Sequence, residues 1–214
     1  PQLRILHSHG SEGYTPAVDD GIVWSGGHRT TDSRYNVVRM GDAMAEVFAQ
    51  AGISVLHDRT LYDYPSYNEA YDRSKAAVEQ WLKQYPTIKV VLDVHRDAIE
   101  TESGTRMAPV WAGSGAGEQA AQVMIICGCD NGGSVQLPNW RLNLCFAAKW
   151  EERMEMLYPG LTRPVLCGYR FYNQDVSPGA LLIEIGGHAN TVQQAVRAGQ
   201  YAAKALAALF DGSV

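Results

Sequence analysis

Short apolar runs alternate with longer amphipathic stretches along this chain, and this pattern is the strongest constraint on its fold. The clearest runs are LRILH at 3–7, ISVLH at 53–57, IKVVLDV at 88–94 and ALLIEI at 180–185. Strands buried in a parallel sheet are nearly continuous apolar runs, and helices connect them across the faces of the sheet. We therefore predict an α/β fold, with a twisted, mostly parallel sheet flanked by helices on both faces.

The spacing of the apolar residues also predicts the bounds of individual elements. Strands are expected at Leu3–His7, Ile53–His57, Ile88–Val94, Met107–Trp111, Gln122–Cys127, Pro164–Cys167 and Ala180–Ile185. Helices are expected at Asn36–Gln50, Asn68–Gln84, Trp140–Leu157 and Thr191–Phe210. The segment GSGAGE at 113–118 lacks the Lys-Ser/Thr pair of a phosphate-binding loop, and we predict a plain turn there.

Length and charge exclude several classes of protein. A chain of 214 residues suits one sizeable domain. The formal net charge is −5, and no local cluster of Lys and Arg offsets it, which argues against nucleic acid as the main partner. No apolar run reaches the roughly eighteen residues that a membrane-spanning helix needs. Because the chain begins at Pro1 without a signal-like segment, we expect a piece of a longer protein.

Three ionisable side chains stand where predicted strands end. His9 follows the first strand, His95 follows VVLDV, and Glu184 lies at the end of LLIE. The carboxyl ends of parallel strands meet at one edge of a sheet, where loops converge and sites form. We therefore expect these three side chains to lie close together.

The same region carries the ligand types that zinc prefers. Catalytic zinc takes three protein ligands, commonly two His and one carboxylate, and keeps a position for water. His9, Glu12 and His95 fit this pattern, with Glu184 as a separate carboxylate that transfers a proton. His7 shares a strand face with His9, so His7, His9 and His95 form a rival ligand set. The spacing alone leaves both sets open.

Charged neighbours of His95 suggest supporting roles. Asp93 precedes His95 by two residues on the same strand face and could orient it as a hydrogen-bond acceptor. Arg96 follows directly, and it could hold a substrate carboxylate or stabilise an oxyanion. A salt bridge from Arg96 to Asp97 or Asp93 is the alternative. His57 is expected to be structural.

Five sequence blocks, in this order, resemble the stage II sporulation protein P family. They are HSHGSEGYTP, RTTDSRYNVVRMGD, HDRTLYDYPSYNEAYDRS, KVVLDVHRDA and RFYNQDVSPGALLIEIGGHANT, and the resemblance extends from Leu3 to about Phe210. That family comprises zinc-dependent cell-wall hydrolases that act in forespore engulfment. The resemblance implies that residues 1–214 form one catalytic domain that cleaves peptidoglycan as an N-acetylmuramoyl-L-alanine amidase, with cross-link endopeptidase activity also reported for the family.

The resemblance also implies partners and a location. The expected partners are a lytic transglycosylase, stage II sporulation protein D, and a membrane protein, stage II sporulation protein M. Full-length members carry an N-terminal transmembrane anchor, so we expect an extracytoplasmic, membrane-anchored protein whose anchor precedes Pro1. The alternatives are a zinc endopeptidase or carboxypeptidase that acts on stem peptides only, and a peptidoglycan-binding module without activity.

The catalytic domain is similar in turn to the larger family of zinc amidases that separate cells. In those enzymes the first strand ends in Asp-Pro-Gly-His-Gly, which places the first ligand at His9 rather than His7. Their second ligand His matches His95, and their catalytic Glu matches Glu184. Their ligand Glu opens the first helix, but the corresponding SRYNVVRMGD contains no Glu. Glu12 is the nearest substitute, and the resemblance therefore favours Glu12 as the third ligand.

Two long loops are expected to line a groove for glycan and stem peptide. They are Gly13–Ser33 and Gly168–Pro178. With Arg96, the residues predicted to contact substrate are Asn173 and Gln174 in RFYNQD. Further candidates are the aromatic residues Tyr172, Trp111 and Trp140. For the two tryptophans, burial in the core is the alternative.

Overall fold

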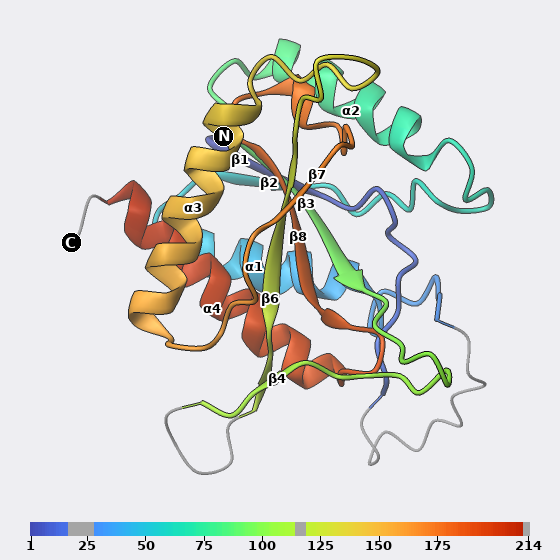
Figure 1. The fold of residues 1–214 in the computed structure, drawn as a ribbon. Coiled ribbons are helices and arrows are strands. Elements are labelled where there is room, and N and C mark those ends of the chain that lie inside the picture. Colours follow the sequence, from blue (N-terminus) through green and yellow to red (C-terminus); the bar gives the residue numbers. More distant parts are fainter. Residues whose placement is uncertain (17–27, 114–118, 212–214) are drawn as a thin grey trace.

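A six-stranded sheet forms the centre of the molecule (Figure 1). The computed structural model describes residues 1–16, 28–113 and 119–211. In spatial order the strands are β2 (Val55–His57), β1 (Leu3–Leu6), β3 (Val90–Asp97), β8 (Ala180–Gly187), β6 (Val123–Gly128) and β7 (Leu166–Gly168). The strands β2, β1, β3 and β8 are parallel, whereas β6 runs antiparallel to β8 and parallel to β7. The prediction of a mostly parallel sheet is thus confirmed.

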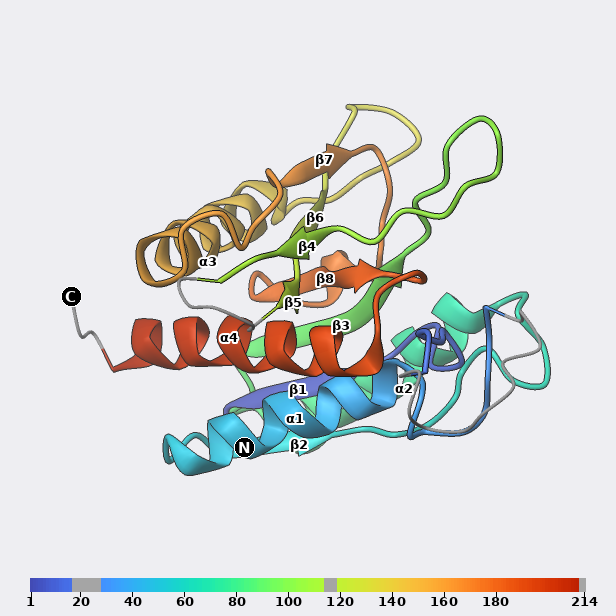
Figure 2. The same ribbon diagram turned by 90° about the horizontal axis from the view of Figure 1, so that it is seen from below.

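Helices cover both faces of this sheet, as predicted. Three of them, α1 (Val37–Gln50), α4 (Val192–Phe210) and α3 (Trp140–Leu157), lie side by side on one face (Figure 2). The opposite face carries α2 (Ala70–Gln84). A separate two-stranded sheet contains β4 (Val110–Trp111) and β5 (Ala120–Ala121). Among the described helices, none combines the length and apolar composition that crossing a bilayer requires.

The main core lies between the sheet and the three helices α1, α3 and α4. Phe48 of α1, Trp150 of α3 and Leu206 of α4 are buried there against Leu92 and Ile183 of the central strands. Burying side chains of this size stabilises a fold by roughly 1.5–3 kcal/mol each. This apolar layer fixes the positions of β3 and β8, and so of the side chains on their other face.

The α2 face of the sheet is apolar at one end and polar at the other. Leu6 and Val91 pack against Val78 of α2 in a smaller cluster. Because side chains alternate along a strand, Asp93 and His95 point to this same face nearer the carboxyl end of β3. The polar end of this face is where the candidate site lies.

The observed bounds differ from the predicted ones mainly at strand ends. Helix α3 has the predicted bounds, and α1 and α4 begin one residue later, after the capping residues Asn36 and Thr191. Strands β3 and β8 extend beyond the predicted ends because pairing continues there, with Asp97 opposite Gly187. His95, expected after its strand, lies within β3, whereas Glu184 lies within β8 as predicted.

One of the two predicted loops contains regular structure. The loop at 168–178 contains a short 3-10 helix, Gln174–Val176. Residues 17–27 of the loop at 13–33, and residues 114–118 of the GSGAGE turn, lie outside the described residues.

Candidate metal centre

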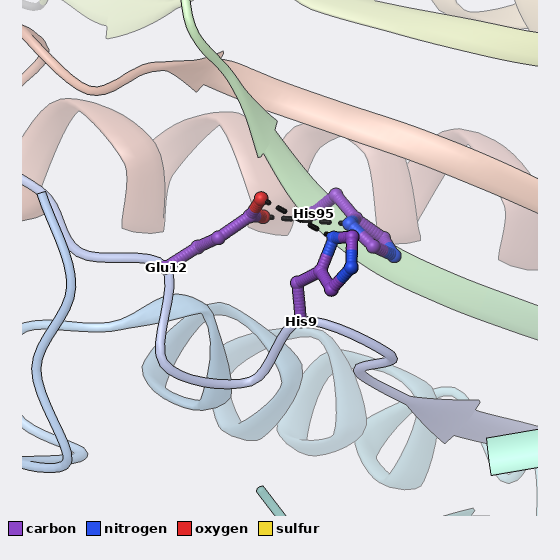
Figure 3. A group of neighbouring side chains, drawn as sticks. All are labelled: His9, Glu12 and His95. Atoms are coloured by element: carbon purple, nitrogen blue, oxygen red, sulfur yellow. Dashed lines mark ion pairs between the residues drawn. The ribbon is translucent and has the colours of Figure 1, made fainter. Parts of the chain in front are cut away.

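Three predicted ligands, His9, Glu12 and His95, come together at the carboxyl ends of β1 and β3. His9 and Glu12 belong to one turn after β1, in which the Glu12 N–H donates to the His9 carbonyl at 3.1 Å. The Glu12 carboxylate faces both imidazoles: Oε1 lies 3.7 Å from Nδ1 of His9, and Oε2 lies 3.4 Å from Nδ1 of His95 (Figure 3). One ligand atom from each residue lies within 4.8 Å of the other two.

Asp93 lies at the Nε2 edge of the His95 ring and forms an ion pair with it. Its Oδ1 atom is 2.9 Å from Nε2 of His95. The Asp93 carboxylate also accepts hydrogen bonds from the Ser8 N–H at 2.8 Å and the Ser8 hydroxyl at 2.6 Å. A carboxylate that engages one ring nitrogen leaves the other, here Nδ1, directed at the ligand position. The structure therefore places Asp93 as the sequence led us to expect.

The charged groups of this cluster shift one another's pKa values. Burial alone would lower the pKa of His95, but Asp93 and Glu12 outweigh it and raise that pKa well above its usual value. For Glu12, burial favours a higher pKa, yet His95 and Arg96 hold the pKa below its usual value. A buried carboxylate between two imidazoles is a donor set that suits zinc. The residues present thus fit the predicted metal.

His7, the rival ligand, belongs to a different cluster under α1. Its Nδ1–H donates to the Val94 carbonyl at 2.8 Å, and its Nε2 lies 2.9 Å from Nε2 of His57. Nδ1 of His57 in turn lies 3.1 Å from Oδ1 of Asp42 in α1. We call His7, His57 and Asp42 the inner cluster. Both ring nitrogens of His7 are engaged there, so the geometry gives the rival ligand set no support.

Glu184 of β8 stands beside the candidate metal centre. It pairs in register with His95 on the neighbouring strand, so the two side chains share a face of the sheet. Its Oε2 atom is buried and has no hydrogen-bond partner among the described residues. Burial raises the pKa of Glu184 to about 8, although His95 acts in the opposite direction. A buried carboxyl group with a free oxygen is suited to accept and return a proton.

Comparison with known proteins identifies the family. The family model described as Stage II sporulation protein P matches residues 1–207. The chain belongs to the stage II sporulation protein P family. Stage II sporulation protein P of Bacillus subtilis (strain 168) is 26% identical over 221 residues, which cover 96% of this chain and 50% of that protein. The chain therefore spans about half the length of this relative.

Two solved structures share the fold of this family member. The N-acetylmuramoyl-L-alanine amidase AmiC2 of Nostoc punctiforme is 9% identical, with a TM-score of 0.55 over 98% of this chain and 97% of that chain. An N-acetylmuramoyl-L-alanine amidase from Clostridium difficile 630 is 13% identical, with a TM-score of 0.56 over 100% of this chain and 98% of that chain. At these identities the similarity establishes the fold, and the predicted amidase-like architecture is confirmed.

Arg96 has a scaffolding position in this family member, unlike the substrate contact that we predicted. Its Nε donates to the Gly13 carbonyl at 2.9 Å, and its Nη2 donates to the His28 carbonyl at 2.5 Å. Its backbone N–H donates to Oε2 of Glu12 at 3.1 Å. The side chain is buried, and these bonds hold the loop that carries Glu12. Since loop carbonyls already engage the guanidinium, the arrangement gives no support to substrate binding by Arg96.

Gln174 also lies inside the scaffold, whereas Asn173 reaches a cleft. The Gln174 side chain is buried, accepts from the Gly128 N–H at 2.9 Å and donates to the Ile126 carbonyl at 2.7 Å. Its amide thus ties the loop at 168–178 to β6 and is not available to substrate. Asn173 lines the cleft while its Nδ2 donates to the Tyr71 carbonyl at 2.8 Å.

The cleft opens beside the candidate metal centre and has a volume of about 650 Å³. It runs between α2 and the loop at 168–178, and its lining residues are His9, Tyr67, Tyr71, Asp72, Lys75, Arg170, Phe171, Tyr172 and Asn173. The predicted groove residue Tyr172 is among them. The predicted loop supplies four of these residues, and α2 with the segment before it supplies four more.

The two tryptophans predicted as groove candidates lie elsewhere in the structure. Trp111 packs against Tyr158 and Tyr201, and Trp140 lines a separate, smaller cavity of about 290 Å³. Sequence reasoning missed Tyr67 and Tyr71. Their spacing of four residues, with Tyr67 just before the predicted helix Asn68–Gln84 and Tyr71 in its first turn, could have indicated one shared surface.

Proposed function

We propose that this chain is the catalytic domain of a zinc-dependent peptidoglycan hydrolase that cleaves the N-acetylmuramoyl-L-alanine amide bond. The observation that carries the proposal is the convergence of His9, Glu12 and His95 at the mouth of a cleft, with Glu184 on the neighbouring strand. Membership of a sporulation protein family and the fold shared with amidases support it.

In this proposal His9, Glu12 and His95 hold the zinc ion. When bound, zinc polarises the amide carbonyl and lowers the pKa of a water molecule. The protein's contribution is to present the three ligands from two elements and to keep His95 oriented through Asp93. The Arg96 N–H, which donates to Glu12, orients the carboxylate ligand in the same way.

Glu184 moves the proton. It accepts a proton from the attacking water and delivers it to the nitrogen of L-alanine, whose bond to the lactyl carbonyl carbon breaks. In the metal-free protein, burial raises the pKa of Glu184 to about 8, and a bound zinc ion would act in the opposite direction by favouring the carboxylate that accepts the proton.

The cleft accommodates the substrate in the same proposal. Tyr67, Tyr71 and Tyr172 form an aromatic wall, and Lys75 and Arg170 add positive charge. Aromatic side chains with a few placed polar groups are typical of small-molecule and cofactor pockets, and they suit the sugar rings and the carboxylates of a glycopeptide.

Digestion of purified muropeptides tests the bond and the mechanism together. The parent protein should release intact stem peptides and leave peptide-free glycan. Glu184→Gln should lower the rate by about 10²–10⁴-fold, the contribution typical of a positioned acid–base group. Glu79→Gln, at an exposed position of α2, is the matched control and should retain the parent rate. A Glu184→Gln variant that digests sacculi as fast as the parent would overturn the mechanism.

The same digestion separates the remaining proposals. We propose, from the family resemblance, a cross-link endopeptidase activity, an extracytoplasmic location through an anchor outside this chain, and action with stage II sporulation proteins D and M. Endopeptidase activity should produce uncrosslinked peptides that are still attached to glycan. Products of this kind alone would indicate a stem-peptide enzyme, and binding without any product would indicate a peptidoglycan-binding module.

A further inference from the structure

Tyr71, the second residue of α2, lies at the boundary between the candidate metal centre and the cleft. Its ring is 5.1 Å from the His9 ring, edge to face at 73°. It is 6.1 Å from the His95 ring and nearly parallel to it, at 12°. The same ring lines the cleft. One phenol therefore contacts the space that the substrate would fill and lies beside two of the three candidate ligands.

The first turn of α2 is fixed to the site, which places this phenol accurately. The Tyr71 carbonyl accepts from Asn173 Nδ2 at 2.8 Å, from the far side of the cleft. One turn further, the Ser74 hydroxyl lies 2.6 Å from the Ser8 hydroxyl, which donates to Asp93. Since Asp93 forms an ion pair with His95, these contacts connect the helix that carries Tyr71 to the candidate metal centre.

The hydroxyl of Tyr71 is a free donor. Within the described residues, the Tyr71 hydroxyl has no hydrogen-bond partner. The hydroxyls of Tyr14 and Tyr62, in contrast, donate to the Ile185 carbonyl and to Oδ2 of Asp58. A phenol with its ordinary pKa of about 10 carries this proton at neutral pH.

We propose that Tyr71 is a catalytic residue whose hydroxyl donates a hydrogen bond to the carbonyl oxygen of the scissile amide as negative charge develops on it. This inference rests on the proposed function. A fixed donor aimed at an oxyanion contributes most in a site that excludes water, and removing one such donor typically lowers kcat by about 10²–10³-fold. Arg96, the donor that the sequence offered for this role, is occupied by loop carbonyls.

The test compares Tyr71→Phe with Tyr64→Phe, which removes a hydroxyl from an exposed tyrosine outside the cleft. The Tyr64 side chain is 62% exposed and does not line the cleft. On a soluble muramoyl-L-alanyl peptide, Tyr71→Phe should lower kcat by about 100-fold while KM changes little. Zinc content and thermal stability should equal those of the parent. Tyr64→Phe should retain the parent kcat.

A titration without turnover gives an independent readout. A phosphinate analogue, in which a tetrahedral phosphorus replaces the amide carbon, presents two oxygens in place of the oxyanion. Tyr71→Phe should bind it at least about 10-fold more weakly than the parent, and Tyr64→Phe should bind it as tightly as the parent. Unchanged kcat and analogue affinity in Tyr71→Phe would overturn the inference, as would a loss fully explained by lost zinc. If the parent binds the analogue but does not cleave the amide, the proposed function fails while the titration still decides the role of Tyr71.

Discussion

Two clusters of histidine and carboxylate side chains begin two residues apart in the chain and lie on opposite faces of the sheet. The inner cluster, around His7, lies under α1, and the candidate metal centre, around His9, lies beside α2. In the inner cluster, the ring nitrogens of His7 engage a backbone carbonyl and a second imidazole. In the candidate metal centre, Nδ1 of His9 and Nδ1 of His95 both face the Glu12 carboxylate. The same residue types thus give a closed structural cluster in one place and converging ligand atoms in the other.

The backbone explains why the two clusters diverge. His7 continues the alternation of Leu3 and Ile5, which places it on the core face of β1. The chain then turns at Ser8, whose N–H donates to Asp93, and this turn carries His9 to the other face. Spacing of two residues predicts a shared face only while the strand continues, and β1 ends at Leu6. Whether a histidine binds metal therefore depends on which of its lone pairs the fold leaves free.

The largest expected difference between the clusters is in metal content. His9→Ala and His95→Ala should each reduce zinc, measured by elemental analysis after dialysis, from near-stoichiometric to background, because two remaining protein ligands do not retain the ion. His7→Gln should keep its zinc while losing stability, since it disrupts only the inner cluster. If His7→Gln lost zinc as completely as His9→Ala, the separation of the two clusters would be wrong.

A smaller effect is expected from the carboxylates that lie behind the imidazoles. Asp93→Asn should weaken zinc binding by about 10–100-fold, because Asp93 orients His95 and strengthens its ligand nitrogen. Asp42→Asn makes the same change behind His57 and should leave zinc affinity unchanged. Competition with a chelator of known affinity measures both. Equal affinities in the two variants would contradict the assignment of Asp93.

The smallest effect concerns stability at acid pH. Burial lowers the pKa of His7 from 6.5 to about 3, so between these values the unfolded chain binds a proton that the folded chain does not. Stability should therefore fall as pH decreases through this window, and His7 should account for about 2 kcal/mol at pH 5 relative to pH 7.

Denaturant unfolding of the parent and of His7→Gln at both pH values isolates this contribution. The pKa of His95 is raised, so in the metal-free protein its contribution to stability is complete below pH 6.5 and is lost as pH rises above that value. The two clusters thus act in different pH windows. Titration of the His7 ring near pH 6.5 in the folded protein would refute the prediction for the inner cluster.

Most of the architecture could be predicted from the sequence because apolar periodicity reports directly on burial. The bounds of α3 follow from it, as does the order of strands and helices along the chain. The end of β3 could not be predicted in this way, because His95 and Asp97 continue the backbone pairing with β8 despite their polar side chains. Hydrogen bonding extends this strand beyond Val94, where the apolar run ends.

For the site, the sequence indicated which residues gather but not what each side chain contacts. The strand-end rule brought His9, His95 and Glu184 to one edge, and Glu12 follows His9 in a tight turn. The sequence predicts substrate contacts for Arg96, a cation next to His95, and for Gln174, which belongs to a loop expected to line the groove. Both instead bond to backbone groups of distant segments, and such partners leave no trace in the local sequence.

The three candidate ligands come from two separate parts of the fold. Two of them belong to a single turn after β1, and the third belongs to β3 in the sheet. An ion shared by them would join that turn to the sheet, so the turn could open only after the ion departs. Loss of zinc would then stop catalysis and would also free the turn that carries His9, one of the residues that line the cleft.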